Sequence, residues 1–370
     1  MFNSKNHNAS GDDSPAAWDE SGEQQLWEEH WHLFCHRSEV AEPHAFLKLD
    51  IFQEEVVVFN DGHELVAFDN RCPHRGARIF ESHSGKQRWV CPYHGWAFLK
   101  GKFYIPQKET FRDSDPKQAQ LNRYHMTWVG DFLFVSKRPR LNISDQLGIV
   151  EPILSSISKS MGEQRDMNAY EYKSNWKIAV ENALDQYHVP LVHEKTLSRL
   201  NLGPAKDEYV GSNNISRAEI GDDKVARKLR SIKRLFDLKI NIEGYIAIYI
   251  FPYTFLTSTF GYSYSLQQFY PSIDNNRSFF TSRFYTGRLA QNIQPNSLAA
   301  FFDSSIELNH QVFKEDAGIC ARIPYSSWSI QAGQYVCDGE SKVLEFRRRL
   351  GAWVLNKRIS DESTDKIGEV

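Results

Sequence analysis

The sequence predicts an α+β protein that is built from two folded regions. Its 370 residues correspond to about two domains at a typical ~150 residues each. The first region contains short apolar runs between turn residues. Its run EEVVVFNDGHELVAF places Asn60-Asp61-Gly62 between two predicted strands, as in a β-hairpin. The second region combines helical patterns with long strand-like stretches rich in Tyr, Phe, Ile and Thr, and such segregation is typical of the α+β class.

The first region follows a polar N-terminal segment, residues 1–25, which we expect to be disordered because it is rich in Asn, Ser and Asp. Residues 24–34 are predicted to form a short helix, since their apolar side chains are spaced for one helical face: Leu26, Trp27, Trp31 and Phe34. Residues 128–135, WVGDFLFV, predict two strands that turn at a Gly-Asp pair. We therefore place a small antiparallel β domain with a leading helix at residues 26–140.

The second region is placed at residues 141–356 and is followed by a polar tail, residues 357–370. Its predicted elements are a polar connector between Pro139 and Pro152, a helix over residues 175–193 that breaks near Pro190, long antiparallel strands over residues 244–288 and a long helix over residues 299–317. The sequence contains no internal repeat and no low-complexity tract.

The charge balance argues against several classes of partner. Lys and Arg number 44 and Asp and Glu number 47, which gives a net charge of −3. A nucleic-acid-binding surface or a polybasic membrane anchor would need a basic excess. The longest apolar run, residues 245–251, stops at Pro252 and is far shorter than the roughly 18 residues of a membrane span. We therefore expect neither nucleic acid nor a membrane as a partner.

The cysteines indicate a reducing compartment. They are odd in number and widely scattered, which disfavours a disulfide framework: Cys35, Cys72, Cys91, Cys320 and Cys337. The N-terminus also lacks the apolar core of a signal peptide. We expect a cytoplasmic protein in which Cys35, Cys320 and Cys337 are small buried hydrophobes.

Two of the cysteines lie beside histidines in short clusters. The motif CPH at residues 72–74 is followed, after residues 75–90, by the motif CPYH at residues 91–94. Two interpretations compete: a tetrahedral structural zinc site, or a [2Fe–2S] cluster with two Cys on one iron and two His on the other. The candidate ligands are Cys72, His74, Cys91 and His94.

The residues around these ligands favour the iron–sulfur cluster. Each motif has a Pro after the Cys and a Gly after the His, in CPHRG and CPYHGW, and such loops can direct backbone N–H groups at cluster sulfides. The pair of motifs resembles that of the Rieske oxygenases, the terminal components of non-haem iron ring-hydroxylating systems. Two further histidines, His63 and His83, match no motif and are interpreted as surface residues.

A second constellation lies in ENALDQYHVPLVH, where His188 and His193 are five positions apart and Asp185 precedes His188 by three. On a helix, Asp185 and His188 would share a face. An isolated pair of this spacing would more simply be a solvated helix face. The residues before it are NWK at positions 175–177 and EN at positions 181–182. Together with this segment they resemble the catalytic-domain signature of the same Rieske oxygenases, and that signature follows the two Cys/His motifs in the order expected for the family.

The resemblance implies a mononuclear Fe(II) that is held by His188, His193 and one carboxylate, with open positions for O2. Its carboxylate is an Asp on a late helix, often preceded by Glu, and the candidates in this sequence are Asp303, Glu307, Glu315 and Asp316. The Glu-Asp pair in FKEDAGIC fits that pattern, so we choose Asp316. Helical spacing then places Asn309 and Phe313 on the face of Asp316 as candidate pocket residues, although Phe313 fits an ordinary core equally well. Asn182 is a third candidate.

The resemblance also implies roles beyond ligation. The acidic residue that matches Asp185 connects the iron's histidine to a Rieske histidine of a neighbouring subunit, here His188 with His94 or His74. Family members assemble as trimeric rings, so a homotrimer is expected. The implied fold is an antiparallel β Rieske domain followed by a helix-grip (START-like) catalytic domain with a curved antiparallel sheet and long helices.

The implied activity is that of a terminal oxygenase, in which electrons pass from the Rieske cluster to Fe(II) and O2 is used to hydroxylate a small aromatic or hydrophobic substrate. No Gly-rich flavin or nicotinamide fingerprint is apparent. NAD(P)H is therefore expected to act through a separate reductase, with or without a ferredoxin. Two alternatives remain open: oxidative O- or N-demethylation by the same machinery, and an electron carrier or ligand-binding protein whose iron site is inactive.

Overall fold

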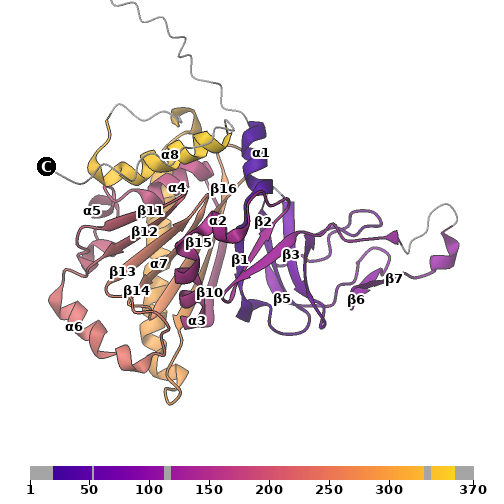
Figure 1. Cartoon of the computed structure of the whole chain (residues 1–370), viewed down its shortest axis with the longest axis horizontal. Coiled ribbons are helices and arrows are strands. Elements are labelled where there is room, and N and C mark those ends of the chain that lie inside the picture. Colours follow the sequence, from indigo (N-terminus) through magenta and orange to yellow (C-terminus); the bar gives the residue numbers. More distant parts are fainter. Residues whose placement is uncertain (1–19, 52–53, 112–117, 329–334, 355–370) are drawn as a thin grey trace, which may run out of the picture.

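A computed structural model of the protein describes residues 20–51, 54–111, 118–328 and 335–354. It contains two units that lie side by side, the first drawn in indigo to magenta and the second in magenta to yellow (Figure 1). The first unit is built from small antiparallel sheets, and the second from one seven-stranded antiparallel sheet with long helices. The predicted α+β class is confirmed.

In the residues that the structure describes, the first unit begins with α1 (Glu20–Glu29) and contains nine short strands. They are β1 (His32–His36), β2 (Ala45–Ile51), β3 (Glu54–Asn60), β4 (Leu65–Asp69), β5 (Ser84–Lys86), β6 (Ala97–Leu99), β7 (Lys102–Tyr104), β8 (His125–Val129) and β9 (Phe132–Ser136). The strands form sheets in the orders β1-β9-β8, β4-β3-β2-β5 and β6-β7. A core rich in Phe and Trp lies beneath the two Cys/His motifs.

Local sequence explains the hairpin between β3 and β4. Asp61 is buried at the turn, and its Oδ1 atom accepts hydrogen bonds from the backbone N–H groups of His63 (2.7 Å) and Glu64 (2.8 Å). Gly62 adopts φ +85°, a conformation that glycine accepts without steric cost. The predicted hairpin is therefore present.

The predicted helix over residues 24–34 is only half correct. Helix α1 ends at Glu29. Phe34 lies in the buried strand β1, and Trp31 directly precedes that strand. Strand β1 is buried on both faces, so its apolar residues do not alternate and the helical spacing of the sequence was misleading. The start of α1 at Glu20 also shortens the expected N-terminal segment. Residues 1–19 and 355–370, the rest of that segment and the predicted C-terminal tail, lie outside the described residues.

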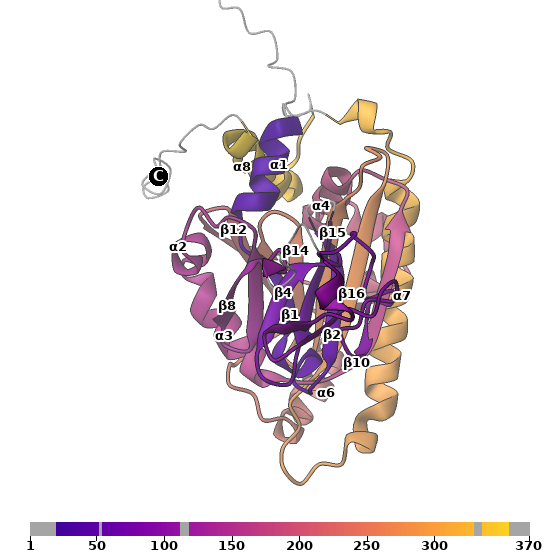
Figure 2. The same ribbon diagram turned by 90° about the vertical axis from the view of Figure 1, so that its right-hand side faces the viewer.

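The second unit is organised around one large sheet with the strand order β10-β16-β15-β14-β13-β12-β11. Its strands are β10 (Met161–Tyr172), β11 (Lys206–Val210), β12 (Asn213–Ala218), β13 (Tyr245–Ile250), β14 (Thr254–Thr259), β15 (Ser263–Pro271) and β16 (Ser278–Gly287). Its helices are α2 (Ile143–Leu147), α3 (Val150–Ser160), α4 (Trp176–Leu184), α5 (Val189–Val192), α6 (Asp223–Ser231), α7 (Ala299–Cys320) and α8 (Ser341–Val354). Figure 2 shows α7 running along the sheet beside β16 and β10.

Two predicted elements of this unit differ from the structure. The expected connector between Pro139 and Pro152 contains α2 and the start of α3, because Asn142 caps α2 by accepting a hydrogen bond from the backbone of Asp145. The helix predicted over residues 175–193 breaks at Asp185 and not near Pro190. Pro190 instead lies in the first turn of α5, where its missing N–H costs nothing.

The two faces of the large sheet have different neighbours. On one face, helix α4 contacts β15 and helix α7 contacts β10, while α8 contacts α4. The opposite face packs against α3 and the first unit in one apolar core. On that face, Arg283 of β16 is fully buried and donates to the carbonyl oxygen of Phe34 (2.7 Å) and to Glu39 of the first unit (3.2 Å). A buried ion pair therefore joins the two units.

We expect Arg283→Met to destabilise the protein by roughly 3–5 kcal/mol, because the change leaves the Glu39 carboxylate buried without its cation. Urea unfolding followed by circular dichroism measures this loss. Arg277→Met is a matched control, since Arg277 is about half exposed in its ion pairs with Glu171 and Asp274 and should cost less than about 1 kcal/mol. Equal losses in the two variants would contradict the structural role of Arg283.

Candidate metal centres and substrate cavity

The two Cys/His motifs form loops of matching geometry. The Gly76 N–H donates to the carbonyl of Cys72 (2.8 Å), and the Gly95 N–H donates to that of Cys91 (3.0 Å). Both glycines are left-handed, with φ +71° and +70°, which glycine adopts far more readily than other residues. Each CPxxG sequence therefore closes into a tight turn that carries one cysteine and one histidine.

The four candidate cluster ligands lie close together. Cys72 and Cys91 are buried, and burial together with the neighbouring Cys91 raises the pKa of the Cys72 thiol. The backbone N–H groups of His74 and Arg75 donate to this sulfur and oppose that rise. The rings of His74 and His94 are 4.7 Å apart, and His74 stacks on Trp96.

The chemistry of this donor set fits a [2Fe–2S] cluster. The His74 Nδ1 atom is buried and has no hydrogen-bond partner in the part of the chain that the structure describes. A buried ring nitrogen without a partner is costly unless an ion binds it. Two thiols and two imidazoles on facing loops, with backbone N–H groups directed at sulfur, are the groups that such a cluster requires.

A second set of ligand atoms converges between α4, α5 and α7. His188 and His193 flank the single turn of α5, and Asp316 lies on α7. The Nε2 atom of His193 is 3.0 Å from Asp316 Oδ1 and 3.3 Å from the Nε2 atom of His188. One ligand atom from each residue lies within 4.8 Å of the other two. These atoms form a His-His-Asp candidate metal site.

Carboxylates hold both imidazoles by their other nitrogen. His188 Nδ1 is 3.2 Å from Asp185 Oδ2, and His193 Nδ1 is 2.8 Å from Glu315 Oε2. If each Nδ1 carries the shared proton, both Nε2 atoms are left as acceptors that face each other. Two facing lone pairs are unfavourable unless a cation lies between them, so this arrangement favours a bound metal ion.

The electrostatics of the site point the same way. Burial lowers the pKa of His188, but hydrogen bonds to Asp185 and Asp316 outweigh it and raise the pKa to about 9. The pKa of Asp316 is lowered from its usual value by hydrogen bonds to both histidines, although burial opposes this. Asn182 also donates to Asp316 Oδ1 (2.8 Å). The pocket therefore stabilises positive charge among these three side chains.

Sequence reasoning missed the role of Glu315, which it considered only as a rival ligand to Asp316. Glu315 accepts hydrogen bonds from His193, from Thr196 Oγ1 (2.7 Å) and from Gln311 Nε2 (3.2 Å). The adjacent acidic pair on one helix was the available signal, because neighbouring helical residues point about 100° apart and can serve two different partners.

Glu315→Ala is expected to weaken binding of the mononuclear metal by roughly 10- to 100-fold, because His193 loses the acceptor that orients its ring. Competition titration of the iron-free protein with Fe(II) or Co(II) measures the affinity. Glu315→Gln keeps an acceptor oxygen, so its affinity for the metal should fall less. Glu307→Gln, an exposed glutamate on the same helix, is the control and should leave the affinity unchanged.

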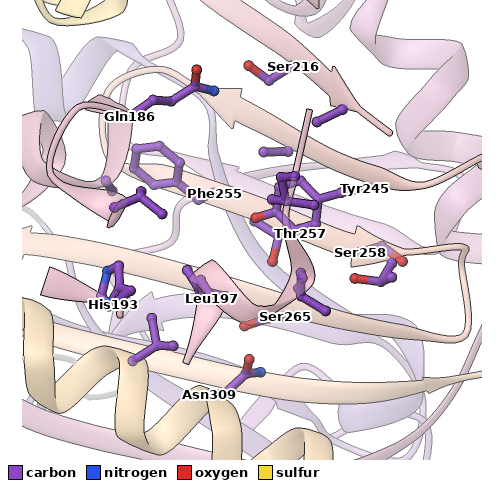
Figure 3. Close-up of a pocket in the computed structure, with 18 of the residues that line it drawn as sticks. Gln186, His193, Leu197, Ser216, Tyr245, Phe255, Thr257, Ser258, Ser265 and Asn309 are labelled. Atoms are coloured by element: carbon purple, nitrogen blue, oxygen red, sulfur yellow. The ribbon is translucent and has the colours of Figure 1, made fainter. Parts of the chain in front are cut away.

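A cavity of about 650 Å³ opens beside the His-His-Asp site. Its wall includes the three predicted pocket residues, Asn182, Asn309 and Phe313. Figure 3 shows side chains from several strands and helices converging on this space. The volume is in the range of drug-sized ligand sites.

Few of the sheet's aromatic residues line this cavity. Between positions 245 and 264 the aromatic residues are Tyr245, Tyr249, Phe251, Tyr253, Phe255, Phe260, Tyr262 and Tyr264, and only Tyr245 and Phe255 of these line the wall. Tyr264 faces the opposite side of β15 from Ser263 and Ser265, and packs in the core with α3. The floor is instead rich in Ser, Thr and Ala.

The remaining sequence-predicted residues have structural surroundings. Cys35 and Cys320 are fully buried, as expected, whereas Cys337 is partly exposed. His63 and His83 lie on the surface. Within the described ranges, no helix has the length and apolar character to cross a membrane.

Two family models match the chain in succession. A model of the Rieske [2Fe-2S] domain matches residues 30–110, and a model of the ring hydroxylating alpha subunit (catalytic domain) matches residues 162–356. The matched segments contain all the candidate ligands described above.

Curated relatives include enzymes of several kinds. The anthranilate 1,2-dioxygenase large subunit of Acinetobacter baylyi is 28% identical over 215 residues, which are 54% of this chain and 46% of that protein. The 2-halobenzoate 1,2-dioxygenase large subunit of Burkholderia cepacia is 31% identical over 45% of this chain and 39% of its own length. The chain thus aligns with less than half the length of these two. A chloroplastic choline monooxygenase of Amaranthus tricolor is 24% identical over 87% of this chain and 72% of its own length.

Solved structures share the fold. A quaternary ammonium Rieske monooxygenase in complex with L-carnitine aligns with a TM-score of 0.70 at 18% identity, covering 90% of this chain and 91% of the other. Naphthalene 1,2-dioxygenase from Rhodococcus sp. bound to indole aligns with a TM-score of 0.64 at 16% identity, covering 90% and 92%.

Proposed function

Because this chain belongs to the Rieske non-haem iron oxygenase alpha subunits, we propose that it is the terminal oxygenase that hydroxylates a small aromatic or hydrophobic compound with O2. The observation that supports this most strongly is the convergence of His188, His193 and Asp316 beside a cavity of ligand size. In a monooxygenation one oxygen atom would enter the product and the other would leave as water, whereas in a dioxygenation both would enter the product.

We propose residues 26–140 as the cluster-binding domain, with one iron on Cys72 and Cys91 and the other on His74 and His94. Residues 141–356 would form the catalytic domain, which holds Fe(II) through the His-His-Asp site. When bound, the cluster supplies single electrons and Fe(II) supplies open positions for O2. Asn182 would keep Asp316 oriented, and the cavity would hold the substrate away from bulk water.

We also propose that electrons pass between subunits of a homotrimer. The cluster loops adjoin β6 at one side of the molecule, whereas α5 and its histidines lie on the other side (Figure 1). Asp185 already contacts His188, and the neighbouring Tyr187 and Leu191 are exposed, so this edge is available to a neighbour's cluster domain. Asp185 would then accept a hydrogen bond from His94 or His74 of that neighbour.

NAD(P)H would act only through a partner, a reductase with or without a ferredoxin. On a single chain, His94 and the adjacent Tyr93 are exposed, so an electron donor would approach this ligand of the cluster from the side that the neighbouring subunit leaves uncovered. Exposure of a redox centre's ligand is what outer-sphere electron exchange needs.

The test is a substrate screen that couples reductase-driven O2 uptake to mass spectrometry of the products. Oxygen insertion into a member of the panel supports the proposal. Formaldehyde release would assign oxidative demethylation instead, and the choline monooxygenases among the relatives justify including N-methylated compounds. A protein that holds only the cluster and consumes no O2 with any compound would be an electron carrier.

A further inference from the structure

The cavity has one strongly basic side chain in the part of its wall that the structure describes. Lys342, in the first turn of α8, lines the cavity and is only 6% exposed. Its Nζ atom is 3.1 Å from Ser216 Oγ and 3.4 Å from Asp207 Oδ1. An ammonium group has three N–H donors, so these two bonds leave one for a ligand.

Lys342 lies at the end of a continuous row of small side chains on the cavity floor. The strand registers pair Ser216 with Ala247, Ala247 with Thr257, Thr257 with Ser265, and Ser265 with Phe284. All five residues line the cavity. The row therefore crosses the sheet from β12 to β16 as a narrow track without bulky side chains before Phe284.

The metal site and Lys342 border different parts of the cavity. In Figure 3, Ser216 is at the top of the cavity, whereas His193 and Asn309 are toward the lower left and bottom. Among helices, α7 carries Asp316 and contacts β10 at one edge of the sheet, whereas Lys342 bonds to Ser216 and Asp207 on β12 and β11 at the other edge. A ligand that lies along the track could contact both ends.

The charges on the wall favour an anionic ligand. The two lining carboxylates, Asp185 and Asp316, are both engaged with the histidines of the metal site. A quaternary ammonium group would meet Lys342, and it would find no carboxylate on the described wall other than the two that are engaged with the histidines. Burial lowers the pKa of Lys342 more than Asp207 and Asp185 raise it, so a further anionic partner would stabilise the ammonium form.

We propose that the substrate carries a carboxylate, which the ammonium group of Lys342 binds, while the carbon to be oxidised lies beside the His-His-Asp site. The placement of the oxidised carbon rests on the proposed oxygenase function, whereas the binding of a carboxylate by Lys342 does not. Lys342 would be a specificity-determining residue that selects an elongated, mostly apolar acid over its neutral or cationic analogues.

The experiment measures binding, so it does not depend on turnover. Isothermal titration with biphenyl-4-carboxylate, 2-naphthoate and decanoate, each paired with its carboxamide, gives the preference for the acid. We expect at least one acid to bind more tightly than its amide, and Lys342→Met to reduce that preference by about 10- to 100-fold. Lys342→Arg should retain it.

Asp207→Asn makes the sharpest control, because it removes the carboxylate that competes for Lys342 and leaves the ammonium in place. It should tighten acid binding and leave amide binding unchanged, the opposite of Lys342→Met. A purely structural role of the Lys342–Asp207 pair would weaken both ligands in both variants. That result, or the absence of any acid preference in the unchanged protein, would overturn the proposal. Acid binding through Lys342 without O2 uptake would instead contradict the oxygenase function alone.

Discussion

His188→Ala is expected to lose the iron in excess of the cluster and all substrate oxidation, while the visible spectrum of the cluster stays unchanged. The change removes one of three ligands from the His-His-Asp site, and the four cluster ligands lie in another unit of the fold. Two remaining ligands hold a divalent ion far more weakly than three. Iron analysis of anaerobically purified protein, together with its spectrum and product yield, measures each part of this result.

His310→Ala separates ligation from a general effect of losing a histidine. His310 is an exposed residue of α7, the helix that carries Asp316, and it pairs with Asp166 at the surface. The His310→Ala variant should keep both the mononuclear iron and the activity. Full iron content in His188→Ala would disprove the assigned ligand set, whatever the activity of that variant.

Asp185→Asn is expected to keep both iron centres and still lower turnover, by roughly 10- to 100-fold. The side chain keeps its size and can still accept from the backbone N–H of Tyr187, so the loop before α5 should be preserved. It loses the negative charge that holds His188 and that would connect to the neighbouring subunit's cluster. Stopped-flow oxidation of the pre-reduced cluster in the presence of substrate measures the electron-transfer step directly.

Asp166→Asn provides the corresponding control, because Asp166 also pairs with a histidine but does so at the surface. Its cluster should be oxidised at the normal rate. A normal rate in Asp185→Asn would remove the bridging role, whereas loss of the mononuclear iron there would mean that Asp185 serves only to orient His188.

The sequence predicted those features that depend on short-range constraints. The Cys/His motifs with their flanking Pro and Gly, the turn at Asn60-Asp61-Gly62 and the long helix α7 each depend on residues within a few positions of one another. The turn and the helix are determined by local geometry and need no knowledge of packing. The histidine pair around α5 was assigned as a ligand pair only through its resemblance to the Rieske oxygenases, because its spacing alone fits a solvated helix face.

Other features depend on long-range packing and were therefore not predictable. Trp31 and Phe34 have helical spacing, but Phe34 belongs to a strand that is buried on both faces and Trp31 directly precedes that strand. Lys342 reaches the cavity from α8, more than a hundred positions after its partner Ser216. The cavity floor could be predicted in part from the sequence, because alternation along β15 assigns Ser263, Ser265 and Gln267 to one face.

In the proposed trimer each cluster would serve the iron site of a neighbouring chain, and this has a consequence for mixed assemblies. A chain with Cys91→Ser and a chain with Asp316→Asn would each be inert alone. The two variants would be mixed, unfolded or dissociated, and then reassembled. Some subunit interfaces would then join an intact cluster from one variant to an intact iron site from the other. Such hybrids should regain part of the product yield, as complementing alleles do.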